Sequence, residues 1–379
     1  MTFRSEFPIC ETHAYFDSAS LGPFPRSSYQ LMQTWAREQA TGGSVFWPGW
    51  FDKMNDCFPY AARLIGAKSE EVVPTRTTTE GLILVAQGFR WRPGDNIVFP
   101  ENEFPANIHP WLYLRRRGVE PRAIPVPDGR LTPEALEPYI DNRTRIVSIS
   151  WVSFCNGWRA NLRAIADLVH RRGALLCVDA IQGLGAFPID VREADVDFLS
   201  AGAQKWLLSA QGAGLFYCRE SLIDLLDNIN YGWSSIEDCT DFSRTDQPEL
   251  KTARRFWSAS TSTPNWLSMY ESMRIIEKYT PNAIAQQILL TRKYLLERLK
   301  KFDLTIISDS GGDLDHASGI VVFRFNSLSP ERHRELVNFC KKRNVVPCFR
   351  GGGIRVAIHG FNDTTDIDRL IDCFDDFYR

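Results

Sequence analysis

The sequence has no excess of basic charge and no long apolar run. Its 379 residues carry 44 Lys and Arg against 46 Asp and Glu, a formal net charge of −2, so nothing in the composition attracts a nucleic acid. No apolar segment approaches the roughly 18 residues that cross a bilayer, and Met1 to Glu6 lack the apolar stretch of a signal peptide. We therefore expect neither a nucleic acid nor a membrane as partner.

Metal-binding and disulfide patterns are also missing. The nine cysteines are scattered, odd in number and without a CxxC pair, and the six histidines show no metal spacing. Such cysteines are typical of buried thiols in a reducing compartment. We therefore predict a cytoplasmic protein without a metal site.

What is present is a long, ordered α/β pattern. The chain is 44% apolar and too long for one average domain. Between about residues 60 and 220, strand-like and helical runs alternate, which is typical of a parallel sheet with crossover helices. We predict a large domain over 61–265, a linking helix over 266–302 and a smaller α+β domain over 303–379, with residues 1–60 packing on the small domain.

The elements that this pattern predicts are short and regularly spaced. In the large domain they are strands at 96–99, 123–126, 145–150, 175–178, 198–199 and 215–218, with helices at 79–89, 133–140 and 162–172. In the tail they are strands at 319–325 and 354–358 and helices at 330–343 and 365–377. Ligands of parallel sheets bind beyond the carboxyl ends of the strands, so residues just after these runs are the first candidates for a site.

Asp179 and Lys205 are two such residues. Asp179 ends the apolar run that begins at Ala174, and Lys205 follows the run that begins at Val196. An acid and a lysine in these places suit pyridoxal 5′-phosphate (PLP), whose aldehyde takes the lysine as a Schiff base and whose pyridine nitrogen is kept protonated by the acid. The pair predicts the cofactor.

A phosphate site is predicted where the next apolar helix begins. Thr77 and Glu80 fit a capping box, which places Thr78 and Thr79 in the first turn of the helix at 79–89. Free N–H groups, the positive end of the helix dipole and two hydroxyls favour a phosphate there. An ordinary helix cap without a ligand is the competing interpretation, and the position near the other candidates favours phosphate.

Five motifs in the same order resemble the class V aminotransferase family of PLP enzymes. They are Thr75–Gly81, Glu101–Asn107, Val178–Gln182, Gln204–Trp206 and Arg355 with Asn362. The resemblance runs from about Tyr15 to the C-terminus and takes in cysteine desulfurases, isopenicillin N epimerase and kynureninase. It implies PLP fold type I, with a mostly parallel seven-stranded sheet, and a homodimer with shared active sites.

The resemblance also implies a role for each matching position. Lys205 is similar to the Schiff-base lysine, which also moves protons at Cα, and Asp179 to the partner of the pyridine nitrogen. Gln182 resembles the glutamine that binds the cofactor's phenolic oxygen, and Phe104 takes the place of the aromatic that stacks on the ring. Arg355 aligns with the arginine that holds the substrate's α-carboxylate.

Several positions depart from the family pattern. Gly202 replaces a serine that commonly binds phosphate, although Ser200 is close by, and Gln204 replaces the usual His or Tyr before the lysine. Phe154 stands where desulfurases often carry Asn. In the longer segment 258–265, Thr263 is the residue expected to reach the phosphate of the neighbouring subunit.

Two features stay open at this level. His359, just past the substrate arginine, either approaches the substrate or has a structural role, with the structural role favoured. The segment Trp47–Trp50 either lines the substrate entrance or packs the N-terminal region.

Sulfur chemistry of the desulfurase type is not expected. Desulfurases carry a nucleophilic cysteine on a mobile loop ahead of the substrate arginine, and here Val345 to Arg355 is too short for such a loop. Cys348 lies in a strand-like run and is typical of a buried, inert thiol. We therefore expect an enzyme that is not a persulfide-forming cysteine desulfurase.

The resemblance implies the first steps of the reaction, up to the carbanion intermediate that the members of the family share. An amino-acid substrate would form an external aldimine, lose its Cα proton to Lys205 and give a quinonoid intermediate. A lyase of the β-elimination or C–S type is favoured, with an aminotransferase or epimerase as alternatives. Kynureninase-like Cβ–Cγ cleavage and an oxygen-using or decarboxylating reaction stay open, and so does a regulatory dimer that has lost catalysis.

Overall fold

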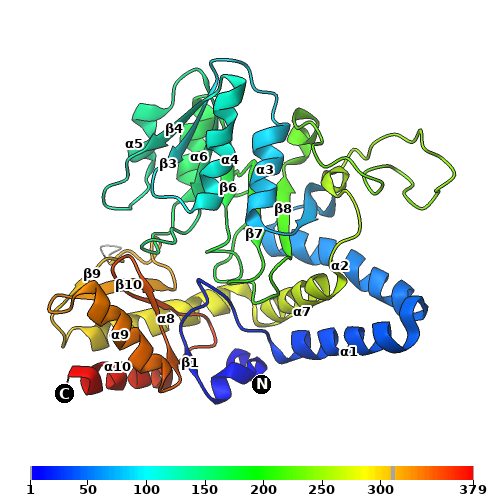
Figure 1. Ribbon diagram of the computed structural model, residues 1–379. Coiled ribbons are helices and arrows are strands. Elements are labelled where there is room, and N and C mark those ends of the chain that lie inside the picture. Colours follow the sequence, from blue (N-terminus) through cyan, green and yellow to red (C-terminus); the bar gives the residue numbers. More distant parts are fainter. Residues whose placement is uncertain (1, 309–311, 379) are drawn as a thin grey trace.

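Two β-sheets organise the chain in the computed structural model, which describes residues 2–308 and 312–378 (Figure 1). The larger sheet has seven strands, and β8 alone runs antiparallel to its neighbours. In sheet order these are β2 (Val72–Thr75), β8 (Gly214–Cys218), β7 (Phe198–Gly202), β6 (Leu175–Asp179), β5 (Thr144–Ser150), β3 (Asn96–Pro100) and β4 (Glu120–Ile124). The prediction of a mostly parallel seven-stranded sheet is confirmed.

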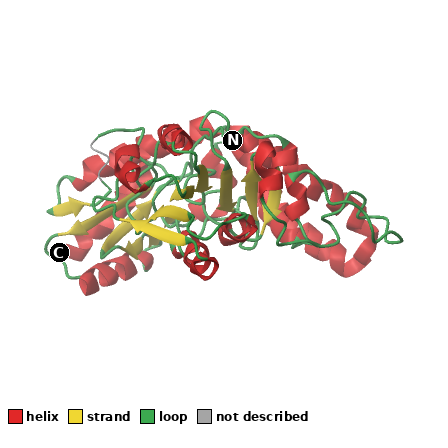
Figure 2. Cartoon of the chain, turned by 90° about the horizontal axis from the view of Figure 1, so that it is seen from above, coloured by secondary structure: helices red, strands yellow, loops and turns green. Residues whose placement is uncertain are grey.

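Helices lie on both sides of this sheet (Figure 2). The helices after its strands are α3 (Thr78–Gly88), α4 (His109–Leu112), α5 (Pro133–Leu136) and α6 (Leu162–Arg171). Successive residues of β3 enter different cores: Ile97 and Phe99 pack with α3 and α4, whereas Val98 packs with α6. Because side chains alternate across a strand and both faces are covered, every residue of β3 is buried. The sheet is a rigid platform that holds its strand ends in fixed positions.

The smaller lobe is a four-stranded antiparallel sheet with two helices against it. Its strands, in sheet order, are β12 (Cys348–Arg350), β13 (Gly353–Ala357), β10 (Ile320–Phe325) and β9 (Leu304–Ile306), and its helices are α9 (Pro330–Lys341) and α10 (Thr364–Tyr378). A short parallel pair, β1 (Ala14–Tyr15) and β11 (Val345–Val346), joins the N-terminal segment to this lobe. The tail is therefore α+β.

The linking region is two helices, not the single helix predicted over 266–302. α7 (Thr263–Tyr279) ends at Thr280, where φ is +61°, and α8 (Pro281–Leu299) starts at once. Pro281 has no N–H with which to continue the ladder of α7, and the Thr280 hydroxyl accepts a hydrogen bond from Ala283 N–H. The sequence signal for this break was the proline.

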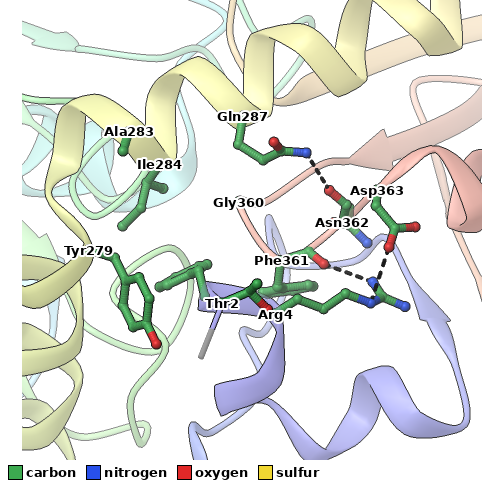
Figure 3. A pocket seen from close by; sticks show the side chains of 11 residues that line it. Thr2, Arg4, Tyr279, Ala283, Ile284, Gln287, Gly360, Phe361, Asn362 and Asp363 are labelled. Carbon is green, nitrogen blue, oxygen red and sulfur yellow. Dashed lines mark hydrogen bonds and ion pairs between the residues drawn. The ribbon is translucent and has the colours of Figure 1, made fainter.

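The N-terminal segment divides between the two lobes. Arg4 pairs with Asp366 at 2.6 Å and bonds the Phe361 carbonyl at 2.8 Å, beside a cavity of about 370 Å³ that Figure 3 shows. None of the candidate site residues lines this cavity. By contrast, α1 (Arg26–Gly42) and α2 (Trp47–Ile65) run beside α7 and extend away from the small lobe (Figure 1). Only the first part of the predicted 1–60 segment packs on the small domain.

Five short strands were not predicted: β1, β2, β9, β11 and β12. Each is two to four residues long; β12 pairs with the next strand of its own hairpin, and the others pair with segments farther away in the chain. β4 also lies three residues earlier than the predicted strand at 123–126. Over residues 2–308 and 312–378, no helix combines the length and the apolar character needed to cross a membrane.

Candidate active site

The carboxyl ends of β6 and β7 bring the main candidates to one edge of the large sheet. Asp179 is the last residue of β6, and its register partner on β7 is Ser200. Lys205 follows three residues after β7 ends. Because β6 and β7 are parallel neighbours, the loops after them lie side by side, as the sequence predicted.

Lys205 is partly buried against an aromatic ring. Its Nζ lies 5.3 Å from the ring centroid of Phe104. Burial lowers the pKa of Lys205 to about 8; the Asp179 carboxylate opposes this shift, and the charge of Arg355 adds to it. A lysine with this pKa is neutral in a large fraction of molecules near pH 8, which suits a nucleophile and a base.

Asp179 is a buried carboxylate with few partners. It is 2% exposed, and the one hydrogen bond to its carboxylate within the described residues comes from Ile181 N–H to Oδ1 at 3.0 Å. Burial raises its pKa to about 6, against the effects of that N–H and of Lys205. A carboxylate in this state is stabilised by a further N–H donor, which a protonated pyridine nitrogen supplies.

Gln182 and Phe104 border the same space. The Gln182 carbonyl accepts from Trp206 Nε1 at 2.7 Å, and its amide donates to the Ala19 carbonyl at 3.2 Å. An amide group has two N–H donors, so one is left for a ligand oxygen. Phe104 is 37% exposed and meets Phe154 edge-on with ring centroids 5.3 Å apart. Its exposed ring is available for stacking.

The N-terminus of α3 is capped largely as predicted. The Thr77 hydroxyl accepts from Glu80 N–H at 3.1 Å. The Glu80 carboxylate, however, accepts from Arg76 N–H at 2.6 Å, one residue before the position that a standard capping box uses. Thr78 is buried and Thr79 is half-buried within this first turn. The turn keeps the free N–H groups and hydroxyls that an anion requires.

Ser200 has a different place from the one predicted. Its hydroxyl is fully buried and donates to the Thr78 carbonyl at 2.9 Å, so its proton is not available to a phosphate. The Thr78 hydroxyl accepts from Gly202 N–H at 2.8 Å and keeps its own proton for a ligand. Ser200 therefore supports Thr78, because its one hydroxyl proton is engaged by the Thr78 carbonyl.

Gln204 and Gly202 fit each other. The side chain of Gln204 folds back over Gly202, and a Cβ placed on Gly202 would lie 2.5 Å from Gln204 Oε1. That oxygen is buried and accepts no hydrogen bond within the described residues. The two departures from the family pattern are thus one local arrangement, and Oε1 is an acceptor that a bound group would satisfy.

Arg355 lies on β13 and is 1% exposed. Its Nη2 donates to Ser20 Oγ at 2.6 Å and to Asp17 Oδ1 at 3.3 Å. Its Nε is buried without a hydrogen-bond partner among the described residues. A buried guanidinium with an unused N–H is suited to a carboxylate ligand.

Sequence reasoning missed three polar residues of this site. Asp17 and Ser20 hold the guanidinium of Arg355. Glu103 is buried beside Asp179, and both of its oxygens accept from Ser150, through the backbone N–H at 2.6 Å and through the hydroxyl. Burial raises the pKa of Glu103 to about 7. The polar cluster Asp17–Ser18–Ser20 in an otherwise apolar segment was the available signal.

The remaining candidates lie outside this group of contacts. Thr263 is the first residue of α7 and is buried, and its proposed contact with a partner's phosphate stays a prediction. In the same segment, the buried hydroxyl of Thr261 has no hydrogen-bond partner in the part of the chain that the structure describes. His359 has a structural place: its ring contacts the Trp206 carbonyl at 3.0 Å and burial lowers its pKa to about 4. Cys348 is half-buried on β12.

These residues fit PLP. Asp179 can accept a further N–H donor, Gln182 has a spare donor, Phe104 exposes a ring, and the α3 turn has free N–H groups, so each part of the cofactor has a matching group. Gln204 Oε1 and Arg355 Nε are also buried without a hydrogen-bond partner among the described residues.

The model of the class-V aminotransferase family matches residues 27–370. A cysteine desulfurase of Escherichia coli (strain SE11) is 31% identical over 323 residues, 80% of this chain and 78% of that protein. An uncharacterized aminotransferase of Bacillus subtilis (strain 168) is 29% identical over 377 residues, 98% of this chain and 96% of that protein.

Solved structures of the protein C-DES share the fold. Two of them superpose with TM-scores of 0.87 and 0.86 at 20% identity, covering 97% of this chain and 98% of C-DES. One holds glycine covalently linked to the PLP cofactor. The other is described as the cystine C–S lyase in complex with its reaction product, cysteine persulfide. At this identity the likeness establishes the fold.

One expectation from the sequence is wrong. The short segment before Arg355 was taken to exclude a persulfide-forming cysteine desulfurase, but a protein 31% identical to this chain is a cysteine desulfurase. The length of one loop is a weak criterion, because loops vary among relatives while the strand ends that hold the cofactor stay in place. The family match confirms the resemblance seen in the motifs: this chain is a member of the class-V aminotransferase family and a PLP enzyme of fold type I.

Proposed function

We propose that this chain is a PLP-dependent lyase that breaks the Cβ–S bond of a sulfur-containing amino acid. The observation that carries the amino-acid part is the buried guanidinium of Arg355 with an unused Nε. The amine of Lys205 and the guanidinium of Arg355 suit the amino and carboxylate groups of one amino acid. The charge of Arg355 reaches Lys205, whose pKa it lowers, so both act in one site.

Different residues of the chain would have different roles in such a reaction. PLP bound at Asp179 would draw electrons from the substrate's Cα, which makes the Cα proton removable. Arg355 would fix the carboxylate and hence the orientation of the Cα–H bond. Lys205, with its pKa lowered to about 8, would take that proton at Nζ and return it to the product or the leaving group.

The choice of a C–S bond is supported by the relatives. A protein 31% identical to this chain is named a cysteine desulfurase, and the structurally similar C-DES is named a cystine C–S lyase. Both names describe removal of sulfur from a cysteine-derived amino acid. β-Elimination from cysteine consumes one water and gives pyruvate, ammonia and hydrogen sulfide, so the step needs no external oxidant or reductant.

The test is a product analysis with purified holoenzyme. Cysteine, cystine and S-alkyl cysteines are each incubated with it, and sulfide, persulfide, pyruvate, ammonia and alanine are measured. We expect release of sulfur together with pyruvate and ammonia in equal amounts. The Lys205→Ala variant should release none, while Lys342→Ala, a change at an exposed lysine, should behave as the wild type. Sulfur amino acids that all stay intact would refute the proposal.

Two other outcomes have support of their own. Alanine in place of pyruvate would indicate desulfuration, the activity named for the 31% identical relative. A 2-oxo acid formed only when a second 2-oxo acid accepts the amino group would indicate transamination, the activity named for the Bacillus subtilis relative. Either outcome would replace β-elimination as the reaction, while the roles proposed for Lys205 and Arg355 would stay the same.

We also propose that the chain works as a homodimer. Aromatic and aliphatic side chains are exposed at the turn between α1 and α2, where Phe46 is 39% and Trp47 44% exposed, and on the loop before α7, where Phe242 is 85% exposed. Both segments extend from the body of the molecule on the same side (Figure 1). Light scattering that gives the mass of a single chain would refute the dimer.

A further inference from the structure

Two phenylalanine rings form a row that leads outward from Lys205. Phe104 lies 5.3 Å from Lys205 Nζ, and Phe154 meets Phe104 edge-on at 5.3 Å and 84°. At the far end of the row, the guanidinium carbon of Arg350 lies 5.7 Å from the centroid of the Phe154 ring. The row joins the reacting amine to a second arginine that the sequence had not singled out.

Arg350 comes from the small lobe, whereas Phe154 belongs to the large one. Arg350 ends β12 and pairs with Gly353 across the hairpin, and Cys348 pairs with Arg355. Since opposite residues of an antiparallel pair share a face and alternate residues of a strand share a face, Arg350 and Arg355 project from the same face of the hairpin. Both arginines are thus directed to the same side of the small sheet.

The charge of Arg350 is not neutralised within the protein. Among residues 2–308 and 312–378, no acidic side chain forms an ion pair with it, whereas Arg355 has Asp17. The charge of Arg350 nevertheless acts on the site. It lowers the pKa of Lys205, and it also lowers the pKa of the Cys155 thiol, against the effect of burial. Arg350 is exposed, and an exposed cation held on an aromatic ring is available to an anion.

From this geometry we propose that Arg350 binds a second acidic group of the substrate, beyond Cβ, while Arg355 holds the α-carboxylate. The substrate class is therefore an amino acid whose sulfur carries an anionic substituent, such as a carboxylate. The inference rests on the proposed function, because Arg355 has to hold the α-carboxylate for Arg350 to reach the other end. Phe104 and Phe154 would line the apolar stretch between the two charged ends.

The sharpest test compares two substrates that differ in one charge. S-(2-carboxyethyl)cysteine and its amide have nearly the same size, and the amide lacks the second acid. With wild-type holoenzyme we expect kcat/KM about tenfold higher for the acid, mainly through KM, because a charge-assisted hydrogen bond is stronger than a neutral one. Arg350→Gln should remove this preference, because it weakens the binding of the acid and leaves that of the amide unchanged. Arg350→Lys should keep part of the preference.

A binding measurement separates recognition from turnover. The α-methyl analogues of the acid and the amide have no Cα proton to lose, so calorimetry reports their affinity for the holoenzyme without reaction. We expect the same preference of about tenfold in the wild type and none in Arg350→Gln. Arg334→Gln is the matched control, because Arg334 also lies over an aromatic ring of the small lobe, 4.4 Å from Phe349. It should keep the wild-type preference.

The two failures are distinguishable. Equal kcat/KM for acid and amide in the wild type, or a preference that persists in Arg350→Gln, would overturn the subsite and leave C–S cleavage standing. If neither compound is cleaved and cysteine and cystine stay intact, the proposed function fails instead, and binding of the α-methyl pair then decides the subsite by itself.

Discussion

The buried Arg355 forms an ion pair with the half-buried Asp17 at the place where a substrate carboxylate is expected. Arg355 Nη2 lies 3.3 Å from Asp17 Oδ1 and 2.6 Å from Ser20 Oγ. Because Arg355 is 1% exposed, its charge requires a counter-charge before any ligand arrives. Asp17 supplies it, and its carboxylate repels the carboxylate of an incoming ligand.

Replacing Asp17 by Asn should therefore tighten the binding of carboxylate ligands while it destabilises the free protein. The amide keeps a hydrogen-bond acceptor for Arg355 but removes the competing charge. We expect the dissociation constant of an amino acid for the holoenzyme to fall about tenfold, and the free energy of unfolding without ligand to fall by about 1–3 kcal/mol. Calorimetric titration and urea unfolding give the two quantities.

The control is Asp363→Asn, which removes the charge from an ion pair of the same length, 3.3 Å, between Asp363 and Arg4. That pair lies on the small lobe outside the site and should leave ligand affinity unchanged. Weaker carboxylate binding in Asp17→Asn would show that Asp17 serves only to orient Arg355.

The close packing of Gln204 against Gly202 leads to a second prediction. A Cβ on Gly202 would lie 2.5 Å from Gln204 Oε1, so Gly202→Ala forces that side chain to move. We expect a loss of about 1–3 kcal/mol in the free energy of unfolding, as for other overpacked sites. In the double variant Gly202→Ala, Gln204→Ala the clash is absent, and most of the loss should be restored.

The double-mutant cycle has a simple control in α2. A Cβ on Gly49 meets nothing within 4 Å, so Gly49→Ala should be neutral or stabilise the protein by up to about 1 kcal/mol. A cycle in which the two changes at 202 and 204 are additive would mean that the side chain of Gln204 does not depend on the glycine.

The parts of the fold that were predictable are those in which the local sequence decides the outcome. Asp179 and Lys205 follow strands buried on both faces, and such strands are continuous apolar runs that are visible without a structure. The helix cap at Thr77 was likewise a local pattern. These elements, together with the order of the motifs, were enough to predict the fold, the family and the cofactor.

What could not be predicted depends on contacts between distant segments. Asp17 meets Arg355 across 338 positions of the chain, and no local pattern encodes such a pair. The hydroxyl of Ser200 was expected at the phosphate because Ser200 is close to Gly202, where the family commonly carries a phosphate-binding serine. Its proton instead goes to the Thr78 carbonyl, 122 positions away. Arg350 gained importance only when β12 and Phe154 came together.

The pKa of Lys205 should respond in opposite directions to two nearby charges. Burial has the largest effect on the pKa of Lys205, which falls to about 8; Asp179 acts against burial and raises the pKa, whereas Arg355 acts with burial and lowers it. Asp179→Asn should therefore lower the pKa of Lys205 and Arg355→Gln should raise it. Competitive acetylation of the cofactor-free protein as a function of pH, read by mass spectrometry at Lys205, measures both. Shifts of the same sign in the two variants would contradict this account.

His170 gives the fold a pH-dependent contribution far from the cofactor. Its Nε2 lies 2.7 Å from Asp197 Oδ2 and its Nδ1 lies 3.1 Å from Asp195 Oδ2. The hydrogen bond to Asp197 and the charges of both carboxylates raise the pKa of His170 despite burial. The same histidine side chain thus ties the end of α6 to the residues just before β7.

A histidine whose pKa is raised on folding stabilises the protein most when it is protonated. Its contribution is complete below the unfolded value of about 6.5 and is lost as the pH rises through the higher folded value. His170→Gln should therefore lower the urea midpoint more at pH 6 than at pH 9. His109→Gln, at an exposed histidine, should have little effect at either pH. A His170→Gln effect that is equal at both pH values, or larger at pH 9, would show that His170 acts through packing and not through its charge.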